Sequence, residues 1–315
     1  MRRIIGAFSA LVAAILTNSV FAQPVEPDQG VAVLSFNVRF GTAEDGDNAW
    51  PRRRERVLDV LRDGPDGLGR PWDIIGVQEA LAFQIDEITR AMPTLEVVGI
   101  GRDDGVRAGE FSAILVRRDR FQVLRSGTRW LSDTPEEPGS MTWGNRIPRI
   151  FTWAELAPRA AGKRAAERKR FVVVNTHWDH ISEASRLASS RAIAAWLRDR
   201  SRFHLPKILT GDFNAGEQSE AMRWLASDAR LRDTWRVLSP DSVEPATFSA
   251  WRGEDRPGSK IDAVLVSHHF AVLNAGIDRR EDAEGRTPSD HFPVWAVASL
   301  KGGGRGTGSR SGTSR

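Results

Sequence analysis

The chain of 315 residues contains no cysteine. Disulfide bonds, thiol catalysis and thiolate metal sites are therefore excluded, and any metal would be held by oxygen atoms and imidazole nitrogens. The absence of disulfides does not argue against export, because a domain of this size buries enough surface without them. With no cysteine at or near Ala22, a lipid-anchored lipoprotein is not expected.

The N-terminus lacks an apolar run long enough for a comfortable transmembrane helix, which needs about 20 residues. Arg2 and Arg3 are followed by a short apolar run over 4–16 and by the small-residue sequence Val20-Phe21-Ala22. This arrangement is typical of a secretory signal peptide over 1–22, cleaved after Ala22. An uncleaved anchor is the alternative. We expect a periplasmic or secreted protein with no stable membrane anchor.

The folded body also lacks an excess of positive charge, although the formal net charge of the chain is +4. Arg2 and Arg3 belong to the predicted signal peptide, and four basic residues without an acid follow Leu300. Leaving out these two segments brings the charge of residues 23–300 to −2. The high isoelectric point is therefore no evidence for nucleic-acid binding. Residues 301–315, rich in Gly, Ser and Arg, predict a disordered basic tail.

Residues 23–300 show the pattern of a single α/β domain, with buried strands alternating with amphipathic helices. We find no internal repeat and no boundary for a second domain. Apolar runs predict strands at 31–40, 72–79, 96–100, 111–117, 122–131, 149–156, 171–180, 207–214 and 259–266, and a last strand after Asp290-His291. Helical spacing predicts helices at 50–61, 80–92, 182–200 and 219–225.

Polar side chains gather where several of these strands end. Each has an ordinary explanation as a turn former, a helix cap or a solvated group, but ligands of α/β proteins collect at the carboxyl ends of strands. Acids, amides and two imidazoles without a thiol suit Mg²⁺ or Mn²⁺ chemistry on a phosphate ester. The residues are Asn37, Glu79, His177, Asp212 with Asn214, and Asp290 with His291, while Asp262 begins a further strand.

Six short motifs occur in order: Phe36-Asn37-Val38-Arg39, Gln78-Glu79, Asn175-Thr176-His177-x-Asp179-His180, Gly211-Asp212-Phe213-Asn214, Lys260-Ile261-Asp262 and Ser289-Asp290-His291. In this order they resemble a secreted, bacterial-type member of the endonuclease/exonuclease/phosphatase superfamily, which has the deoxyribonuclease I-like fold. The resemblance covers about residues 31–300. It implies an α/β (α+β) four-layer sandwich, in which two mixed, mostly antiparallel sheets pack face to face with helices outside. The motifs would then meet at one rim.

The resemblance also implies a divalent metal, Mg²⁺ or Mn²⁺, that binds a non-bridging oxygen of the phosphate and stabilises charge in the transition state. Glu79, helped by Asn37, would hold this metal. Asp262 would tune the network or contact a second metal or a water. These three residues are the predicted metal site.

Five further residues would carry the reaction. Asp212 would orient and deprotonate the attacking water, and Asn214 would fix its geometry. His177 and His291 would contact the phosphate oxygens, with Asp290 holding the imidazole of His291. Positioned acid–base groups of this kind are worth about 10²–10⁴-fold in rate.

Supporting roles follow for residues within or near the motifs. Arg149, at the entrance of a predicted strand, could clamp a phosphate because the guanidinium is a planar fork of donors. Trp178 could stack on a base or a sugar, and packing against the sheets is its alternative. Arg39, Asp179 and His180 are expected to support the site from behind.

Substrate choice should depend on the loops at 141–147 and 247–253, which we expect to border the pocket and which carry Trp143 and Trp251. The first hypothesis is an exported metal-dependent hydrolase of organic phosphates or phosphodiesters, acting as a monomer. A secreted nuclease for DNA or RNA is the main alternative. A lipid phosphodiesterase would need an exposed apolar hairpin, which the sequence does not show, and a non-catalytic binding module should have lost some of the acids and histidines.

Overall fold

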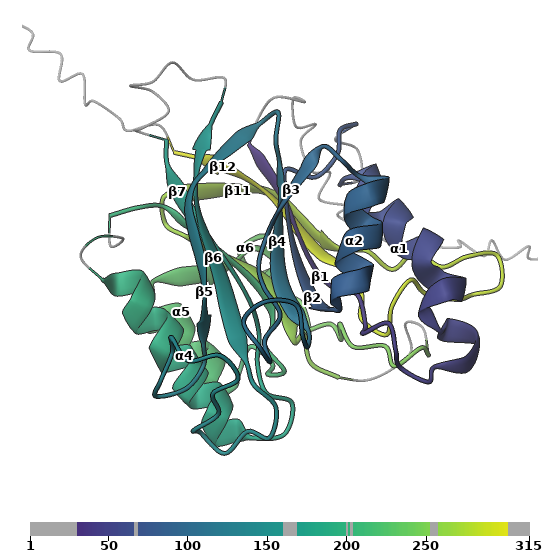
Figure 1. Cartoon of the computed structure of the whole chain (residues 1–315). Helices are drawn as coiled ribbons and strands as arrows, with labels where there is room; N and C mark the ends of the chain where they lie inside the picture. Colours follow the sequence, from purple (N-terminus) through teal and green to yellow (C-terminus); the bar gives the residue numbers. More distant parts are fainter. Residues whose placement is uncertain are drawn as a thin grey trace, which may run out of the picture.

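The computed structural model describes residues 30–65, 69–159, 169–199, 201, 204–252 and 258–301. The predicted signal peptide, the predicted tail and most of the basic connection at 160–170 lie outside the described residues. Two six-stranded sheets pack face to face, and helices cover the outer face of each, as Figure 1 shows. The four-layer sandwich expected from the motifs is thereby confirmed.

The first sheet has the strand order β11-β12-β1-β2-β4-β3. Only β1 and β2 pair in parallel in this sheet, and every other neighbouring pair is antiparallel. Its strands are β1 (Val31–Asn37), β2 (Ile74–Ala80), β3 (Leu95–Val98), β4 (Phe111–Arg117), β11 (Phe270–Ile277) and β12 (Val294–Leu300).

The second sheet has the order β5-β6-β7-β8-β10-β9, and its one parallel pair is β7 with β8. Its strands are β5 (Phe121–Trp130), β6 (Ile150–Pro158), β7 (Phe171–His177), β8 (Lys207–Asp212), β9 (Leu231–Asp233) and β10 (Asp262–Ser267). Each sheet thus has a central parallel pair with antiparallel strands on both sides.

The helices cover the two outer faces of the sandwich (Figure 1). α1 (Trp50–Asp63) and α2 (Ala82–Ala91) lie over the first sheet, and α4 (Glu183–Arg198) and α5 (Glu220–Asp228) over the second. A short 3-10 helix (Gly46–Asn48) precedes α1, and α6 (Thr234–Leu238) follows β9. Among the helices of the described residues, none has the length and apolar character that crossing a membrane requires.

Local sequence explains where the helices begin. Pro51 occupies the first turn of α1, where a missing N–H costs nothing. The side chain of Ser182 caps α4 by accepting a hydrogen bond from the Ser185 N–H at 3.1 Å. Val57, Leu58 and Leu61 of α1 recur at helical spacing and are buried against the first sheet.

The core between the sheets explains why the central strands have apolar runs without alternation. Val33, Ile74, Val173, Ile208 and Val264 are all fully buried in one cluster that both sheets contribute to. A central strand is covered on its other face by helices, so both of its faces are apolar. The elements β9, α6 and β11 were not predicted. β9 and α6 are short, and β11 is an edge strand whose residues are mostly half-buried.

The topology brings the motifs to one rim. β1, β2, β7 and β8 end there, and their antiparallel partners β12, β4, β6 and β10 begin there. The register confirms it, because Asp212 at the end of β8 pairs with Asp262 at the start of β10. Residues far apart in the sequence therefore converge on one small region.

Candidate active site

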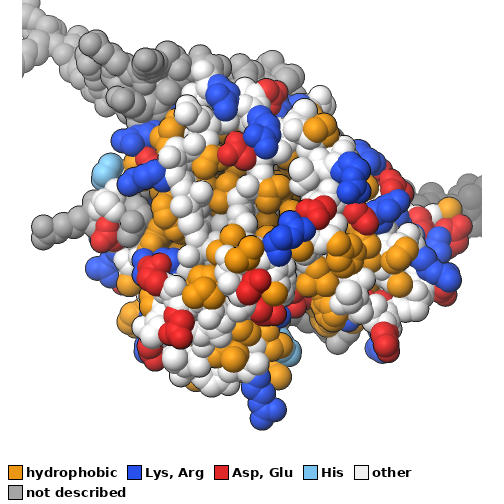
Figure 2. Space-filling model, in the orientation of Figure 1, with side chains coloured by type: hydrophobic (Ala, Val, Ile, Leu, Met, Phe, Trp, Pro, Cys, Tyr) orange, Lys and Arg blue, Asp and Glu red, His pale blue; other side chains and the backbone are white. Residues whose placement is uncertain are grey.

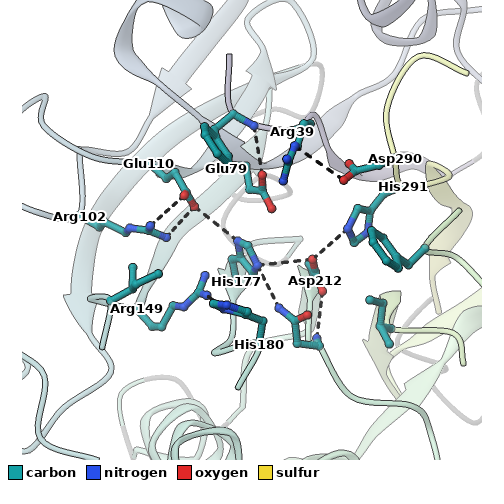
Figure 3. Close-up of a pocket in the computed structure, with 15 residues that line it drawn as sticks. Arg39, Glu79, Arg102, Glu110, Arg149, His177, His180, Asp212, Asp290 and His291 are labelled. Carbon is teal, nitrogen blue, oxygen red and sulfur yellow. Dashed lines mark hydrogen bonds and ion pairs between the residues drawn. The ribbon is translucent and has the colours of Figure 1, made fainter. Parts of the chain in front are cut away.

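A cavity of about 450 Å³ opens at this rim. Figure 3 shows its side chains arriving from both sheets and from the loops between strands. Polar and charged groups face one another across it, and a few apolar side chains complete the wall. The lining residues are Arg39, Phe40, Glu79, Arg102, Glu110, Ile147, Arg149, His177, His180, Asp212, Asn214, Phe248, Ile261, Asp290 and His291.

Asn37 joins the two sheets at the base of the cavity. Its Nδ2 donates to Glu79 Oε1 at 2.9 Å and to Asp212 Oδ2 at 3.0 Å. Its Oδ1 accepts from the Arg39 N–H at 2.9 Å. Because the side chain is fully buried and both of its polar atoms are engaged, Asn37 positions the two carboxylates. The hydrogen bond from Asn37 Nδ2 is thus the way in which Asn37 supports Glu79.

Three site residues have left-handed backbone conformations. The φ angles are 57° at Arg39, 65° at Glu79 and 47° at Asn214. This region is uncommon for residues with a side chain and costs about 1–3 kcal/mol where the surroundings impose it. At Glu79 the strand register of β2 also shifts, between Val77 and Ala80. The local distortion lets the Glu79 carboxylate line the cavity at a position where β2 would otherwise continue regularly.

Asp212, Asn214 and His177 form the centre of the site. The Asn214 N–H donates to Asp212 Oδ1 at 2.9 Å, and Asn214 Nδ2 lies 3.0 Å from His177 Nε2. Burial and then the charge of Asp262 raise the pKa of Asp212 to about 7. Burial, together with Arg149 and Arg102, holds the pKa of His177 well below its usual range. Asp212 can therefore exchange a proton near neutral pH, while His177 is uncharged.

The second histidine is oriented by Asp262. His291 Nδ1 lies 2.9 Å from Asp262 Oδ2, and both side chains are buried. Burial disfavours the imidazolium, but the carboxylates of Asp262 and Asp212 outweigh it and raise the pKa of His291 well above its usual range. The two histidines thus have opposite charge states at neutral pH, which is how one site can supply both a neutral and a cationic imidazole.

The prediction that Asp290 holds His291 is wrong. Figure 3 shows the two neighbours diverging, with His291 facing Asp212 and Asp290 facing Arg39. Asp290 Oδ2 lies 3.8 Å from Arg39 Nε, and its Oδ1 accepts from the Ser289 hydroxyl at 3.2 Å. Asp262 instead takes this place: its Oδ2 is bound to His291, which fits the first of the two roles predicted for it, tuning the network. Successive side chains of extended chain point to opposite sides, so the partner of His291 comes from another strand.

The donor set of the cavity fits a hard divalent cation. Glu79, His177 and Asp212 can each offer one ligand atom, and these atoms lie within 4.8 Å of one another. Asp212, Asp262 and His291 form a second such group, in which Asp262 Oδ2 is bound to His291 Nδ1 and Asp262 Oδ1 has no hydrogen-bond partner among the described residues. Buried carboxylates that repel one another are stabilised when a cation binds between them. Glu79, Asp212 and His177 are therefore the candidate metal ligands.

A basic group lies on the other side of His177. Arg149 Nη2 is 2.9 Å from His180 Nδ1, and Arg149 Nε is 3.5 Å from Asp179 Oδ2. Asp179 Oδ1 accepts from the N–H groups of Ile181 and Ser182 at 3.0 and 2.6 Å. Asp179 therefore fixes the turn before α4 and also contacts Arg149. The expected supporting position of Asp179 is what the structure shows, and His180 itself lines the cavity.

Sequence reasoning missed three charged residues of the site. Arg102 binds Glu110 through two parallel hydrogen bonds, of 2.6 and 2.8 Å, and Glu110 Oε2 lies 3.7 Å from His177 Nδ1. Burial raises the pKa of Glu110 to about 7 against the opposing effect of Arg102. The available signal was position, since Glu110 directly precedes β4 and β4 begins at the rim.

The third missed residue is Arg53 of α1, which is fully buried beneath the site. Its guanidinium donates to the carbonyl oxygens of Val38 at 2.5 Å, Arg39 at 2.7 Å and Pro288 at 3.3 Å. One side chain thus ties the segment after β1 to the segment before Asp290. No sequence pattern distinguishes this arginine from its exposed neighbours in the helix.

Trp178 does not line the cavity, which corrects the prediction that it stacks on a substrate. The side chain is fully buried, and its ring packs edge-on against Phe213 with centroids 4.9 Å apart. Alternation along the chain turns Trp178 away from His177 and into the core beneath α4. Trp143 and Trp251 are not among the residues that line the cavity either. Of the loops expected to border it, the described parts contribute Ile147 and Phe248, and position 253 lies outside the described residues.

Comparisons with known proteins identify the family of the chain. The model of the Endonuclease/Exonuclease/phosphatase family matches residues 34–291. A solved endonuclease/exonuclease/phosphatase from Bacteroides vulgatus is 30% identical, with 86% of this chain and 99% of that chain covered and a TM-score of 0.75. A mannosyl-6-phosphatase from Bacteroides thetaiotaomicron is 31% identical over 86% of this chain and 100% of that one, with a TM-score of 0.73.

A more distant structure, the human Nocturnin catalytic domain with a bound sulfate anion, is 18% identical. The alignment covers 89% of this chain and 97% of the Nocturnin chain, with a TM-score of 0.67. At this level of identity it shows the shared fold alone. A search of curated proteins finds no match. The match to the family model extends over most of the described domain, from β1 to His291. The chain therefore belongs to the Endonuclease/Exonuclease/phosphatase family, and it is a metal-dependent phosphoric ester hydrolase.

Proposed function

We propose that the protein is an exported phosphoesterase that uses Mg²⁺ or Mn²⁺ and hydrolyses small organic phosphates, with phosphorylated sugars as the first class to test. The observation that carries the proposal is the cavity, whose carboxylates, three histidines and guanidinium groups surround a space of about 450 Å³. This volume is typical of sites for small molecules. The likeness to a solved mannosyl-6-phosphatase supports the choice of a sugar phosphate.

The residues divide the reaction between them. Asp212, oriented through Oδ1 by the Asn214 N–H, accepts a proton from the attacking water. Asn214 fixes Asp212 and His177 relative to each other through two hydrogen bonds. His291, protonated and held by Asp262, donates to a phosphoryl oxygen that gains negative charge. His177 would serve as a ligand of the ion and not contact the phosphoryl group itself, which changes the role that the resemblance implied for it.

Glu79, Asp212 and His177 would hold the divalent ion, and Asn37 keeps the first two in place. Such an ion supplies positive charge to a phosphoryl oxygen and so stabilises the transition state. Magnesium and manganese suit this set of oxygen and imidazole donors better than softer ions do.

The test is a panel assay with purified protein, with Mg²⁺ or Mn²⁺ added. Mannose 6-phosphate and glucose 6-phosphate represent sugar phosphates, and single-stranded DNA, RNA, a chromogenic phosphodiester and sphingomyelin represent the alternatives. We expect turnover of a sugar phosphate that EDTA abolishes. Faster hydrolysis of DNA or RNA than of any small phosphate would replace the proposal with a nuclease. Activity that survives EDTA would refute the metal requirement.

Export needs a separate measurement. Expression of the full chain in a Gram-negative host, followed by fractionation and N-terminal sequencing, should find the protein outside the cytoplasm and beginning after Ala22. Cytoplasmic protein that retains residues 1–22 would refute export and leave the enzymatic proposal intact.

A further inference from the structure

Arg149 has a donor that nothing in the described part of the chain satisfies. The side chain is only 3% exposed, and its Nη2 is engaged by His180 and its Nε approaches Asp179. Its Nη1 has no hydrogen-bond acceptor among the described residues. A buried donor without a partner is costly, and more so when it is charged. Such a group is expected to find its partner when the cavity fills.

The carboxylates near Arg149 are already engaged and do not accept a hydrogen bond from its Nη1. Of the other carboxylates that act on Arg149, Glu110 is already held by both terminal nitrogens of Arg102, and Asp212 accepts from Asn37 Nδ2 and the Asn214 N–H. Asp179 has one oxygen committed to two backbone N–H groups and the other beside Arg149 Nε. The acceptor for Nη1 must therefore come from outside this group, and an anionic oxygen of the substrate has the right chemistry.

The position of Arg149 decides which oxygen this is. Figure 3 shows Arg149 with His180 and Arg102 on one side of His177, and Asp290 and His291 on the other. In the proposed mechanism the phosphoryl group contacts His291, on the other side of His177 from Arg149, and an oxygen that it turns toward Arg149 would meet Nη1. A monoester has a bare oxygen there. A diester that turned its second organic group to this side would have to fit it against a buried arginine.

We propose that Arg149 makes this site selective for phosphomonoesters over phosphodiesters, by donating Nη1–H to the phosphoryl oxygen that is esterified in a diester. The inference rests on the proposed function and deepens it from an ester hydrolase to a monoesterase. Asp179 and His180 are positioning residues in this arrangement, because they hold the guanidinium through its other two nitrogens. Arg102 neutralises Glu110, which would otherwise compete for Arg149.

The experiment compares two chromogenic esters that share a leaving group, p-nitrophenyl phosphate and bis(p-nitrophenyl) phosphate, with the mature protein and Mg²⁺. The variants are Arg149→Gln, which removes the charge, and Arg149→Lys, which keeps the charge but loses the planar fork. Arg198→Gln is the matched control, since this arginine of α4 is 53% exposed and pairs only with Asp228 on the surface. Circular dichroism melts establish that each variant is folded.

For Arg149→Gln we expect kcat/KM for the monoester to fall about 10- to 100-fold, the range for one charge-assisted hydrogen bond. The diester should change by less than about threefold, so the ratio between the two esters collapses. For Arg149→Lys the ratio of kcat/KM for the monoester to kcat/KM for the diester should fall by a smaller factor, and for Arg198→Gln it should stay at the wild-type value. Calorimetry gives a readout without turnover. Inorganic phosphate should bind Arg149→Lys more weakly than it binds wild type, and dimethyl phosphate should bind both alike.

Other results would overturn the inference. An equal loss for both esters would mean that Arg149 contacts an oxygen common to them, or only supports the fold. A wild-type protein that prefers the diester would contradict monoester selectivity while leaving an ester hydrolase. If Arg149→Gln does not fold, the Arg149→Lys ratio and its phosphate calorimetry decide the matter. Wild-type protein that hydrolyses neither of these esters nor a sugar phosphate overturns the proposed function and the inference together.

Discussion

Replacing Asp262 with asparagine should shift the pH dependence of the enzyme. Asp262→Asn keeps the shape of the side chain but removes the charge that faces His291 Nδ1 at 2.9 Å. In the wild type, burial opposes the imidazolium, and Asp262 and Asp212 together keep the pKa of His291 well above its usual range. Without the Asp262 charge, less of the unfavourable effect of burial on the imidazolium is offset. The pKa of His291 therefore falls.

The size of the shift follows from the bond that is lost. A hydrogen bond to a charged group is worth about 1.5–3 kcal/mol, and each pKa unit corresponds to about 1.4 kcal/mol. The pKa of His291 should therefore fall by about 1–2 units. Because His291 acts as the protonated donor, activity is lost as pH rises through its pKa. The basic limb of the pH profile should move to lower pH by the same amount.

The assay is kcat/KM for p-nitrophenyl phosphate between pH 5.5 and 10 with saturating Mg²⁺. Near neutral pH we expect a loss of about 10²-fold or more, as is usual when a positioned acid–base group is disturbed. Asp290→Asn is the matched control, since Asp290 faces Arg39 and has the weakest effect of the three acids on the pKa of His291. Coincident basic limbs for wild type and Asp262→Asn would refute the reasoning. A larger shift in Asp290→Asn would restore the pairing of His291 with its sequence neighbour.

Three further predictions concern the metal, the core and the buried arginine. Glu79→Gln should weaken Mn²⁺ binding in calorimetry and lower turnover at least about 100-fold, and unchanged Mn²⁺ affinity would exclude Glu79 as a ligand. Trp178→Ala should cost about 3–5 kcal/mol in urea unfolding, because it empties a fully buried site against Phe213; Trp178→Phe should leave KM unchanged, and a raised KM would return Trp178 to the substrate site. Arg53→Met should cost about 2–3 kcal/mol and reduce kcat, because three carbonyl oxygens lose their donor; a variant as stable and active as wild type would show that these bonds are dispensable.

Much of the fold could be predicted because its central strands are unambiguous. Runs such as Val172-Val173-Val174 are apolar without alternation, and a polar residue marks the end of each strand. The strand ends were expected at one rim, and β1, β2, β7 and β8 do end there. β11 escaped prediction because an edge strand has one exposed side and a weaker apolar pattern.

The pairing of side chains within the site was harder to predict. The partner of His291 lies 29 residues earlier in the chain, whereas Asp290 is adjacent in the sequence and points elsewhere. Trp178 illustrates the same limit, since its direction depends on the alternation of the strand and on the covering helix α4. Sequence order identifies which residues reach a rim. The direction of each side chain depends on strand pairing and twist, which a single sequence does not state.

Arg102, Glu110 and Arg53 could not be singled out by residue type. The chain has 45 lysine and arginine residues, and many salt bridges of the described residues involve exposed arginines with no part in the site. Figure 2 shows Lys, Arg, Asp and Glu scattered over the visible face without a single dominant patch. Burial distinguishes the functional arginines, and burial is a property of the folded chain.

The left-handed backbone at Arg39, Glu79 and Asn214 has a consequence for how the enzyme can change over time. Glycine at position 79 would fit its φ of 65° better than glutamate does, so Glu79→Gly gains backbone freedom and loses the carboxylate at once. For a lineage that no longer needed the reaction, the relief of backbone strain would offset part of the cost of losing the hydrogen bonds that Glu79 accepts from Asn37 and Phe40. Retention of a side chain at these three positions across a set of descendants would therefore record continued use of the site, in a way that its buried core residues could not.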